Sequence, residues 1–134
     1  MQILCKAKDL YSGNWIYGYY IEDQEAAKIY ELDTNTYHVI AKDTVGICID
    51  LYDIRDNLVF TGDIVRCADS SNNTRVFYVD FDSRLASYVF VDSLDKHANV
   101  FTLFDLQQYE LGESMQIKII GNIHDSAKIF DSDN

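Results

Sequence analysis

Three kinds of side chain in this sequence have the chemistry for catalysis or metal binding: histidine, cysteine and closely spaced carboxylates. The histidines are His38, His97 and His124, which are too far apart in the sequence for the close ligand pairs that zinc sites favour. His124 is followed by Asp125, and such a pair can form an oriented base, although a solvated strand end has the same pattern. Histidine spacing therefore predicts no metal site.

Residues 80–82, Asp-Phe-Asp, begin like a calcium-binding loop. The sixth position of that loop is Leu85 where glycine is needed, and the twelfth is Val91 where glutamate is needed. Asp80 and Asp82 would lie on one face of a strand, as they would at a wet hairpin end. This segment therefore predicts no calcium site.

A metal-dependent hydrolase or nuclease that uses Asp80, Asp82 and Asp125 remains one alternative function. The sequence contains no glycine-rich dinucleotide motif, no phosphate-binding loop and no Gly-x-Ser-x-Gly nucleophile motif. We therefore assign no catalytic, cofactor-binding or metal-binding residue from the sequence.

The three cysteines, Cys5, Cys48 and Cys67, are odd in number and widely spaced, which fits neither a disulfide framework nor a zinc pattern. We expect them to be small buried apolar groups. The N-terminal residues lack the pattern of a signal peptide, and no apolar run approaches the roughly 18–20 residues of a membrane-spanning helix. These features predict a cytoplasmic protein that does not enter a membrane.

The chain has 134 residues, with 22 acidic and 11 basic side chains and a formal net charge of −11. A surface of this sign repels phosphate, so direct nucleic-acid binding is not expected. The 10 tyrosines and 7 phenylalanines can stack on bases, but without a basic groove they fit a core and a subunit interface better. The acid excess serves solubility, or the surface imitates nucleic acid, or it meets a basic partner.

Short stretches with apolar residues at every second position dominate the chain, which is typical of strands with one buried face. They cover residues 15–21, 27–32, 36–40, 45–49, 58–60, 63–67, 75–81, 87–91 and 116–123. In the first stretch, Trp15, Tyr17, Tyr19 and Ile21 fall on one side. Segments 75–81 and 87–91 are expected to form a hairpin through residues 82–84.

Helical patterns are few. Residues 102–109 have a helical apolar spacing, with Thr102 placed to cap the first turn. Residues 126–130 fit one short terminal turn, and the acidic end 131–134 is expected to fray. We detect no internal repeat. Many short strands with few helices predict a mainly β protein, either a barrel or a sandwich.

Three further segments contain glycine, and each indicates a particular backbone conformation. Residues 15–18, Trp-Ile-Tyr-Gly, fit a strand in which another backbone approaches the glycine closely. In residues 60–66, Gly62 can adopt a positive φ, and the Asp63 side chain can accept a hydrogen bond from a nearby backbone N–H. Residues 120–125 fit a strand that ends in a Gly-Asn bend.

In this order and spacing the segments resemble the YopX family of phage and prophage proteins. The family pattern has Trp-x-Tyr-Gly, Thr-Val-Gly, Gly-Asp-Ile-Val and Ile-Gly-Asn-Ile segments, which match residues 15–18, 44–46, 62–65 and 120–123. The resemblance extends over nearly the whole chain. The matching residues, which we interpret as structural, are Trp15, Tyr17, Gly18, Gly62, Asp63, Gly121 and Asn122.

The sequence departs from the family pattern around the central turn. Only Leu51 matches the usual Thr-Gly-Leu, and Thr61 replaces the usual glutamate before Gly-Asp. The usual Asn-Gly of the turn is Arg55-Asp56, a stiffer pair at a position where glycine tolerates a positive φ best. If the family glutamate were catalytic, this chain would lack it.

The resemblance implies a mainly β fold, with an N-terminal β region over residues 1–50 and an SH3-like barrel with only short helical turns over residues 51–134. It also implies self-association and no known activity or cofactor. We therefore predict a non-enzymatic accessory protein that acts through protein contacts as a homo-oligomer. The alternative is an acidic host-interference protein that binds a basic DNA-handling partner by charge complementarity.

Overall fold

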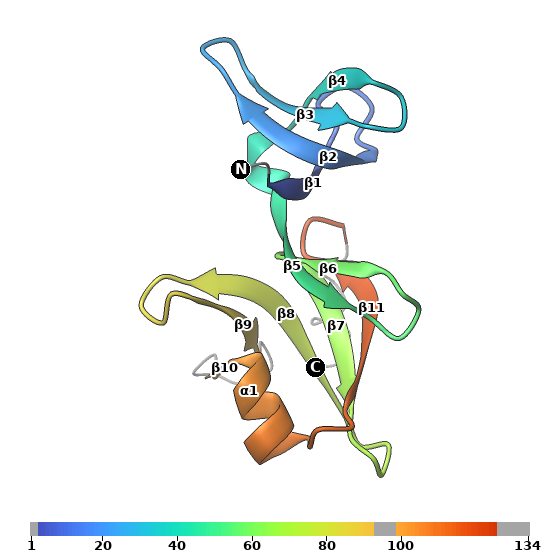
Figure 1. Ribbon diagram of the computed structural model, residues 1–134, viewed down its shortest axis with the longest axis vertical. Helices are drawn as coiled ribbons and strands as arrows, with labels where there is room; N and C mark the ends of the chain where they lie inside the picture. The colour runs from blue at the N-terminus through green and yellow to red at the C-terminus, as the bar shows by residue number, and fades with distance from the viewer. Residues whose placement is uncertain (1–2, 93–98, 126–134) are drawn as a thin grey trace. The chain divides into compact units, whose positions relative to one another are not determined.

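The computed structural model describes residues 3–92 and 99–125, and it confirms a mainly β protein with curled, barrel-like antiparallel sheets (Figure 1). The chain divides into two compact units, Met1–Cys48 and Ile49–Asn134. The turn predicted over residues 126–130 and the acidic end 131–134 lie outside the described residues. No helix in the described part of the chain has the length and apolar character needed to cross a membrane.

The first unit is a meander of four antiparallel strands, a short 3-10 helix and the start of a fifth strand. Its elements are β1 (Leu4–Lys8), β2 (Trp15–Glu22), β3 (Ala27–Glu31), β4 (Thr36–Val39), η1 (Lys42–Thr44) and β5 (Gly46–Tyr52). The strand order is β4-β3-β2-β1-β5. A bridge between Asp9 and Ile40 joins the ends of β1 and β4. This bridge curls the sheet around a small core.

The core of the first unit comprises Cys5, Ala7, Ile29 and Ile40, with Ile16 and Tyr20 packed against it. Residues on β2 alternate between the two faces of the sheet, so Trp15, Tyr17, Tyr19 and Ile21 do share a face. That face is the outer one, since Tyr17 is 51% and Ile21 is 37% exposed. Alternation alone does not show which face is buried.

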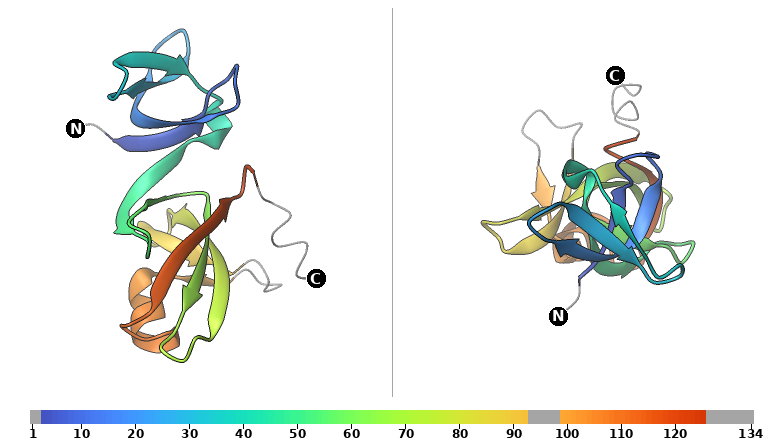
Figure 2. Two further views of the ribbon diagram at one scale, coloured as in Figure 1. Left: turned by 90° about the vertical axis from the view of Figure 1, so that its right-hand side faces the viewer. Right: turned by 90° about the horizontal axis from the view of Figure 1, so that it is seen from above.

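The second unit contains the end of β5 and a five-stranded antiparallel sheet of order β10-β9-β8-β7-β11. Its further elements are β6 (Leu58–Phe60), β7 (Asp63–Ala68), β8 (Thr74–Asp82), β9 (Ser87–Val91), β10 (Val100–Phe101), α1 (Leu103–Asp105), η2 (Leu106–Glu110) and β11 (Gln116–Asn122). The predicted hairpin between residues 75–81 and 87–91 is present as β8 and β9. Figure 2 shows β11 following the helical segment after a short loop.

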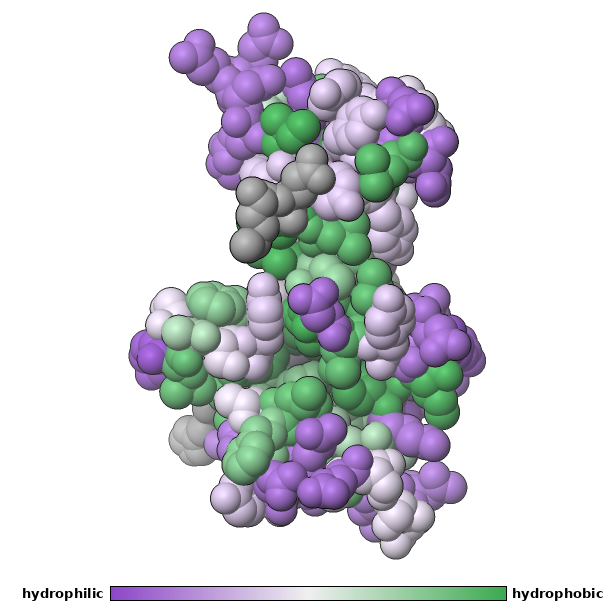
Figure 3. Space-filling view, in the orientation of Figure 1, coloured by the Kyte–Doolittle hydropathy of each residue, from purple (hydrophilic) through white to green (hydrophobic). Residues whose placement is uncertain are grey.

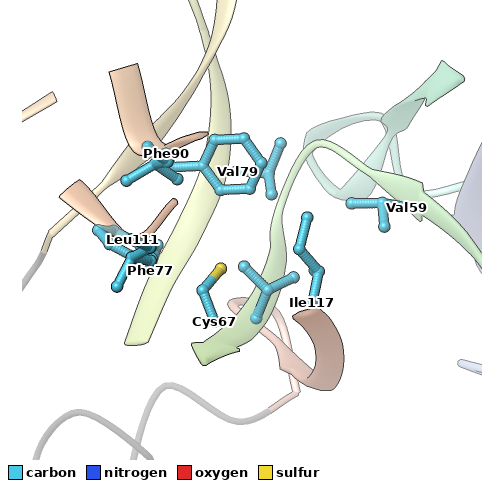
Figure 4. Packing of buried hydrophobic residues seen from close by; sticks show 9 residues of the cluster. Val59, Cys67, Phe77, Val79, Phe90, Leu111 and Ile117 are labelled. Atoms are coloured by element: carbon cyan, nitrogen blue, oxygen red, sulfur yellow. The ribbon is translucent and has the colours of Figure 1, made fainter. Parts of the chain in front are cut away.

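The core of the second unit lies between β7, β8, β9 and the helical segment (Figure 4). Phe77 packs edge-on against Phe90 and Phe101, with ring centroids 6.1 and 6.0 Å apart. Val65 and Leu106 are fully buried in the same cluster. Burying each such side chain contributes about 1.5–3 kcal/mol, so this cluster accounts for much of the stability of the unit.

The predicted helix over residues 102–109 is present, and Thr102 caps it as expected. The Thr102 hydroxyl accepts a hydrogen bond from the Asp105 backbone N–H, and the Asp105 carboxylate accepts one from the Thr102 N–H. From Leu106 the helix continues as a π-helix, because the Leu111 N–H donates to the Leu106 carbonyl. The π turn places the fully buried Leu106 in the core.

All nine predicted strands are present, and the structure adds β1 and β10. β1 also alternates, with Cys5 and Ala7 inside and Lys6 and Lys8 on the other face. Its inner residues are too small to give a clear apolar pattern. β10 has only two residues, which is too short for any periodicity.

The two units share one topology, although the sequence shows no internal repeat. In each, four strands form a meander, a short helical segment follows, and the last strand pairs with the first. The pairs are β5 with β1 and β11 with β7. A barrel was predicted only for residues 51–134, and the first unit has a curled sheet of the same order. Strand order depends on backbone pairing, so two unrelated sequences can adopt it.

Candidate functional site

Asp63 lies at the centre of a buried polar cluster in the second unit. Its side chain is fully buried at the start of β7. One carboxylate oxygen accepts a hydrogen bond from the Phe60 backbone N–H at 2.8 Å, and the other accepts one from the Asn122 side-chain amide at 3.1 Å. The carboxylate therefore fastens the turn before β7 to the end of β11.

The neighbouring motif residues complete this connection. Gly62 has φ of +92°, the conformation expected from the sequence, and its backbone N–H donates to the Val79 carbonyl at 2.7 Å. The Asn122 side-chain oxygen accepts from the His124 backbone N–H at 3.0 Å. Gly121 lies at a β-bulge, where the register of β11 against β7 shifts between Ile119 and Gly121. The structure thus brings two of the sequence motifs together.

The third motif lies in the first unit. Gly18 on β2 is buried, and a Cβ atom added to it would overlap the carbonyl oxygen of Tyr30 on β3. The close backbone approach expected at this glycine is therefore present. On the other face, the Lys6 ammonium lies 5.0 Å from the centroid of the Trp15 ring and 5.9 Å from that of Tyr17. Both distances allow cation–π attraction.

The outer face of the first unit carries a row of three tyrosines, one on each of three neighbouring strands. Tyr19 is directly opposite Tyr30, and Tyr30 is directly opposite Tyr37. The Tyr30 and Tyr37 ring centroids are 5.0 Å apart, and Tyr37 is 62% exposed. We call Tyr19, Tyr30 and Tyr37 the tyrosine row. The sequence predicted Tyr19 on a shared face but not this alignment, which depends on strand register.

Asp53 forms a second buried carboxylate site, which the sequence did not single out. One oxygen accepts from the backbone N–H groups of Arg55 and Asn57, both at 2.9 Å, and the other accepts from the Ile119 N–H at 3.1 Å. Burial alone would raise the pKa of Asp53, but these three hydrogen bonds lower it below its ordinary value. In the same turn, Asp56 has φ of +63°, where the family pattern has glycine.

We expect Asp53→Asn to lower the free energy of unfolding by about 1–2 kcal/mol at neutral pH, because the amide cannot accept from all three N–H groups. A lowered folded-state pKa gives stability that is present above the unfolded pKa, about 3.9, and lost as pH falls through the folded value. Urea unfolding at several pH values from about 7 to about 3 measures this effect. The difference in the free energy of unfolding between the variant and the wild type should shrink below about pH 4. A difference that stays constant over this range contradicts the prediction.

Two of the three carboxylates that a metal-dependent hydrolase would use accept hydrogen bonds from the neighbouring backbone. Asp80 accepts from the Phe81 backbone N–H, and Asp82 accepts from the backbone N–H groups of Arg84 and Leu85. Asp125 is exposed, as is His124. Within residues 3–92 and 99–125, no three histidine, cysteine, aspartate or glutamate side chains are grouped to hold a metal ion.

His38 has partners that its position in the sequence did not suggest. One ring nitrogen lies 3.2 Å from an Asp9 carboxylate oxygen, and the other lies 3.5 Å from a Glu31 oxygen. Hydrogen bonds from the Ser12 and Tyr11 backbone lower the pKa of Asp9, and His38 adds to this effect. His38 therefore connects β4 to β3 and to the end of β1. His97 lies outside the described residues.

Two of the three cysteines are buried, as predicted, and Cys48 is half-buried. Burial raises the pKa of Cys5 to about 11, with a smaller contribution from Cys48, and raises that of Cys67 to about 12. A thiolate is the reactive form of cysteine, so Cys5 and Cys67 are poor nucleophiles in the folded protein.

Comparisons with protein-family models, with curated proteins and with solved structures find no match for this chain. The resemblance to the YopX family therefore remains a prediction from the three motifs.

Proposed function

We propose that this chain is a non-enzymatic phage or prophage accessory protein of the YopX type that acts in the cytoplasm through protein contacts, as a homo-oligomer. The observation that supports this most directly is the tyrosine row on the outer face of β2, β3 and β4. Tyrosine is enriched at protein interfaces because a large, rigid ring buries area at little cost in conformational entropy. Ile21, also 37% exposed on this face, extends the apolar area.

Apolar side chains reach the surface beside hydrophilic ones in both units (Figure 3). In the first unit the exposed members include Tyr37 and Tyr17, at 62% and 51%. A net charge of −11 opposes association between copies. Added salt screens this repulsion, so self-association through an apolar face should strengthen with salt.

We expect size-exclusion chromatography with light scattering to give a multiple of the 15.4 kDa chain mass at high micromolar concentration. Tyr37→Ser should weaken self-association about tenfold or more, because it removes an exposed aromatic anchor. Tyr11→Ser is the matched control, since Tyr11 is 84% exposed in the loop after β1. If the wild-type protein has the mass of one chain, the proposed oligomer is wrong. If both variants weaken self-association equally, the tyrosine row is not the contact surface.

The net charge supports a second candidate function, binding to a basic partner such as a DNA-handling protein. Long-range attraction between opposite charges is screened by salt, so this binding should weaken as salt is added. Salt therefore separates the two candidates, because it should strengthen self-association and weaken capture of a basic partner.

A further inference from the structure

The first sheet ends at β4, and one edge of this strand is open. The sheet order places β3 on one side of β4. On the other side, the bridge between Asp9 and Ile40 reaches only the end of the strand. Within residues 3–92 and 99–125, no strand lies beside residues 36–38 on that side. An open edge presents backbone N–H and C=O groups that can pair with another strand.

The pairing of β3 with β4 shows which backbone groups face this open edge. In an antiparallel pair of strands, residue pairs that exchange hydrogen bonds alternate with pairs that do not. The Ile40 N–H donates to the Ala27 carbonyl at 3.1 Å, so the next hydrogen-bonded pair is Ile29 with His38. Tyr37, next to His38, belongs to the other class. Its N–H and C=O groups therefore point away from β3.

Val39 supports this direction, because it lies two residues after Tyr37 and its backbone groups point the same way. Its carbonyl accepts a hydrogen bond from the Leu10 N–H at 2.9 Å, on the side away from β3. That bond occupies the end of the edge. The N–H and C=O groups of Tyr37 therefore form the centre of the part that is open.

β4 lacks the features by which edge strands usually avoid pairing. Such strands often carry lysine or proline, contain a bulge or are very short. β4 has the sequence Thr-Tyr-His-Val and pairs with β3 in regular register over all four residues. The edge strand β10 of the second sheet has only two residues. Of these two edges, β4 therefore offers the better surface for a further strand.

The side chains at this edge favour a second copy of the chain as the partner. The tyrosine row runs across β2 and β3 and ends at Tyr37, which is 62% exposed. A two-fold axis at Tyr37 would place the two Tyr37 rings side by side and join the two rows into one. β4 has no acidic side chain, so this pairing brings no carboxylates of the two strands together, although the chain carries a net charge of −11.

We infer that β4 pairs antiparallel with β4 of a second copy, about a two-fold axis at Tyr37. Each Tyr37 N–H donates to the Tyr37 carbonyl of the other copy, and the tyrosine rows of the two copies lie on one face of a continuous sheet. A two-fold contact uses the same surface on both copies and closes at two chains. This inference rests on the proposed self-association and specifies its geometry and its number of chains.

Amide hydrogen exchange of the wild-type protein, followed by NMR at increasing protein concentration, tests the backbone pairing. The Tyr37 amide should exchange at least about tenfold more slowly once light scattering gives the mass of two chains, because its N–H is then hydrogen-bonded. The His38 amide is the reference, since its N–H faces β3 at every concentration. A Tyr37 amide whose exchange does not slow as the dimer forms would overturn the pairing.

Cysteine cross-linking tests the register, in a Cys48→Ser background because Cys5 and Cys67 are buried. Tyr37→Cys should give a disulfide-linked dimer on addition of a mild oxidant, since Cα atoms of a hydrogen-bonded pair lie about 5.5 Å apart, within disulfide range. Val39→Cys is the control on the same face of β4, because the proposed register separates its two copies by about 13 Å along the strands. Equal cross-linking at both positions would overturn the register.

Light scattering on the same samples separates this inference from the proposed self-association. A wild type with the mass of one chain would contradict both. A dimer in which Tyr37 exchange is unchanged would contradict only the edge pairing and would leave a contact between the faces of the two tyrosine rows. A mass well above two chains would show that the contact does not close and would overturn the two-fold arrangement. If loss of the ring keeps Tyr37→Cys monomeric, the exchange measurement on the wild type decides.

Discussion

Gly18→Ala is expected to lower the free energy of unfolding by about 3 kcal/mol, a large part of the 5–15 kcal/mol typical of a folded domain. The added Cβ would overlap the Tyr30 carbonyl oxygen and would lie 2.8 Å from the carbonyl carbon and 2.9 Å from the Ile29 Cγ2 atom. The obstacle is backbone of β3, which is paired on both sides with β2 and β4. The clash cannot be relieved by a side-chain rotation.

The single tryptophan provides a local measurement of this effect. Trp15 lies on β2, three residues before Gly18, so its fluorescence during urea unfolding reports the first unit. Gly13→Ala is the control, because Gly13 has φ of +76° but no atom within 4 Å of an added Cβ. That variant should cost about 1–2 kcal/mol through backbone strain alone. A loss at Gly18 no larger than the loss at Gly13 would contradict the steric argument.

Local patterns predicted the strands well because alternation and turn residues act over a few positions. The positive φ of Gly62 and the acceptor role of Asp63 belong to this class, as does the Thr102 cap. Each depends on residues within three or four positions in the chain. The same holds for the turn at Asp53, whose two closest hydrogen bonds are to Arg55 and Asn57.

The features that the sequence did not reveal depend on which strands become neighbours. Asp53 and Ile119 are 66 residues apart, and Asp63 and Asn122 are 59 residues apart. Their contacts exist only because β11 returns to the start of the second unit, where it pairs with β7. The alignment of Tyr19 with Tyr30 and Tyr37 likewise depends on register, which alternation within a single strand does not specify.

Trp15 and Tyr17 lie on the outer face of β2, opposite the close approach of β3. Cys5, Ala7 and Gly18 point inward at neighbouring positions of β1 and β2, where the backbone of β3 approaches closely. Not even a Cβ atom fits at Gly18, and the alternation of β2 places Trp15 and Tyr17 on the opposite face. Their hydrophobicity suggests a core location, but hydrophobicity alone does not decide which face of the strand is buried.

Asp63→Ala is expected to lower the free energy of unfolding by about 3–4 kcal/mol, because it leaves two buried donors without an acceptor. These are the Phe60 backbone N–H and the Asn122 side-chain amide. Removing the carboxylate also opens a small cavity at a fully buried position. Urea unfolding followed by far-ultraviolet circular dichroism measures the loss. Asp80→Ala is the control, because Asp80 is exposed on β8, and it should change the free energy of unfolding by less than about 0.5 kcal/mol.

The hydrogen-bond pattern allows a sharper test, because the two polar partners can be exchanged. Asp63→Asn alone keeps one acceptor but turns an NH₂ group toward a donor, and Asn122→Asp alone places two carboxylates side by side. Each single variant should cost about 2 kcal/mol. In the double variant, the new amide at position 63 can accept from the Phe60 N–H and donate to the new carboxylate at position 122. That carboxylate can still accept from the His124 N–H.

The double variant should therefore be more stable than the sum of the single losses predicts, by about 1–3 kcal/mol in a double-mutant cycle. Such recovery would show that the side-chain hydrogen bond between β7 and β11 accounts for the lost stability. The volume or charge of either side chain alone would not explain it. Additive losses would mean that Asp63 stabilises the unit through its turn alone. The motifs at residues 62–63 and 121–122 would then be two independent bends that happen to lie together, and the interpretation of them as one structural connection would be wrong.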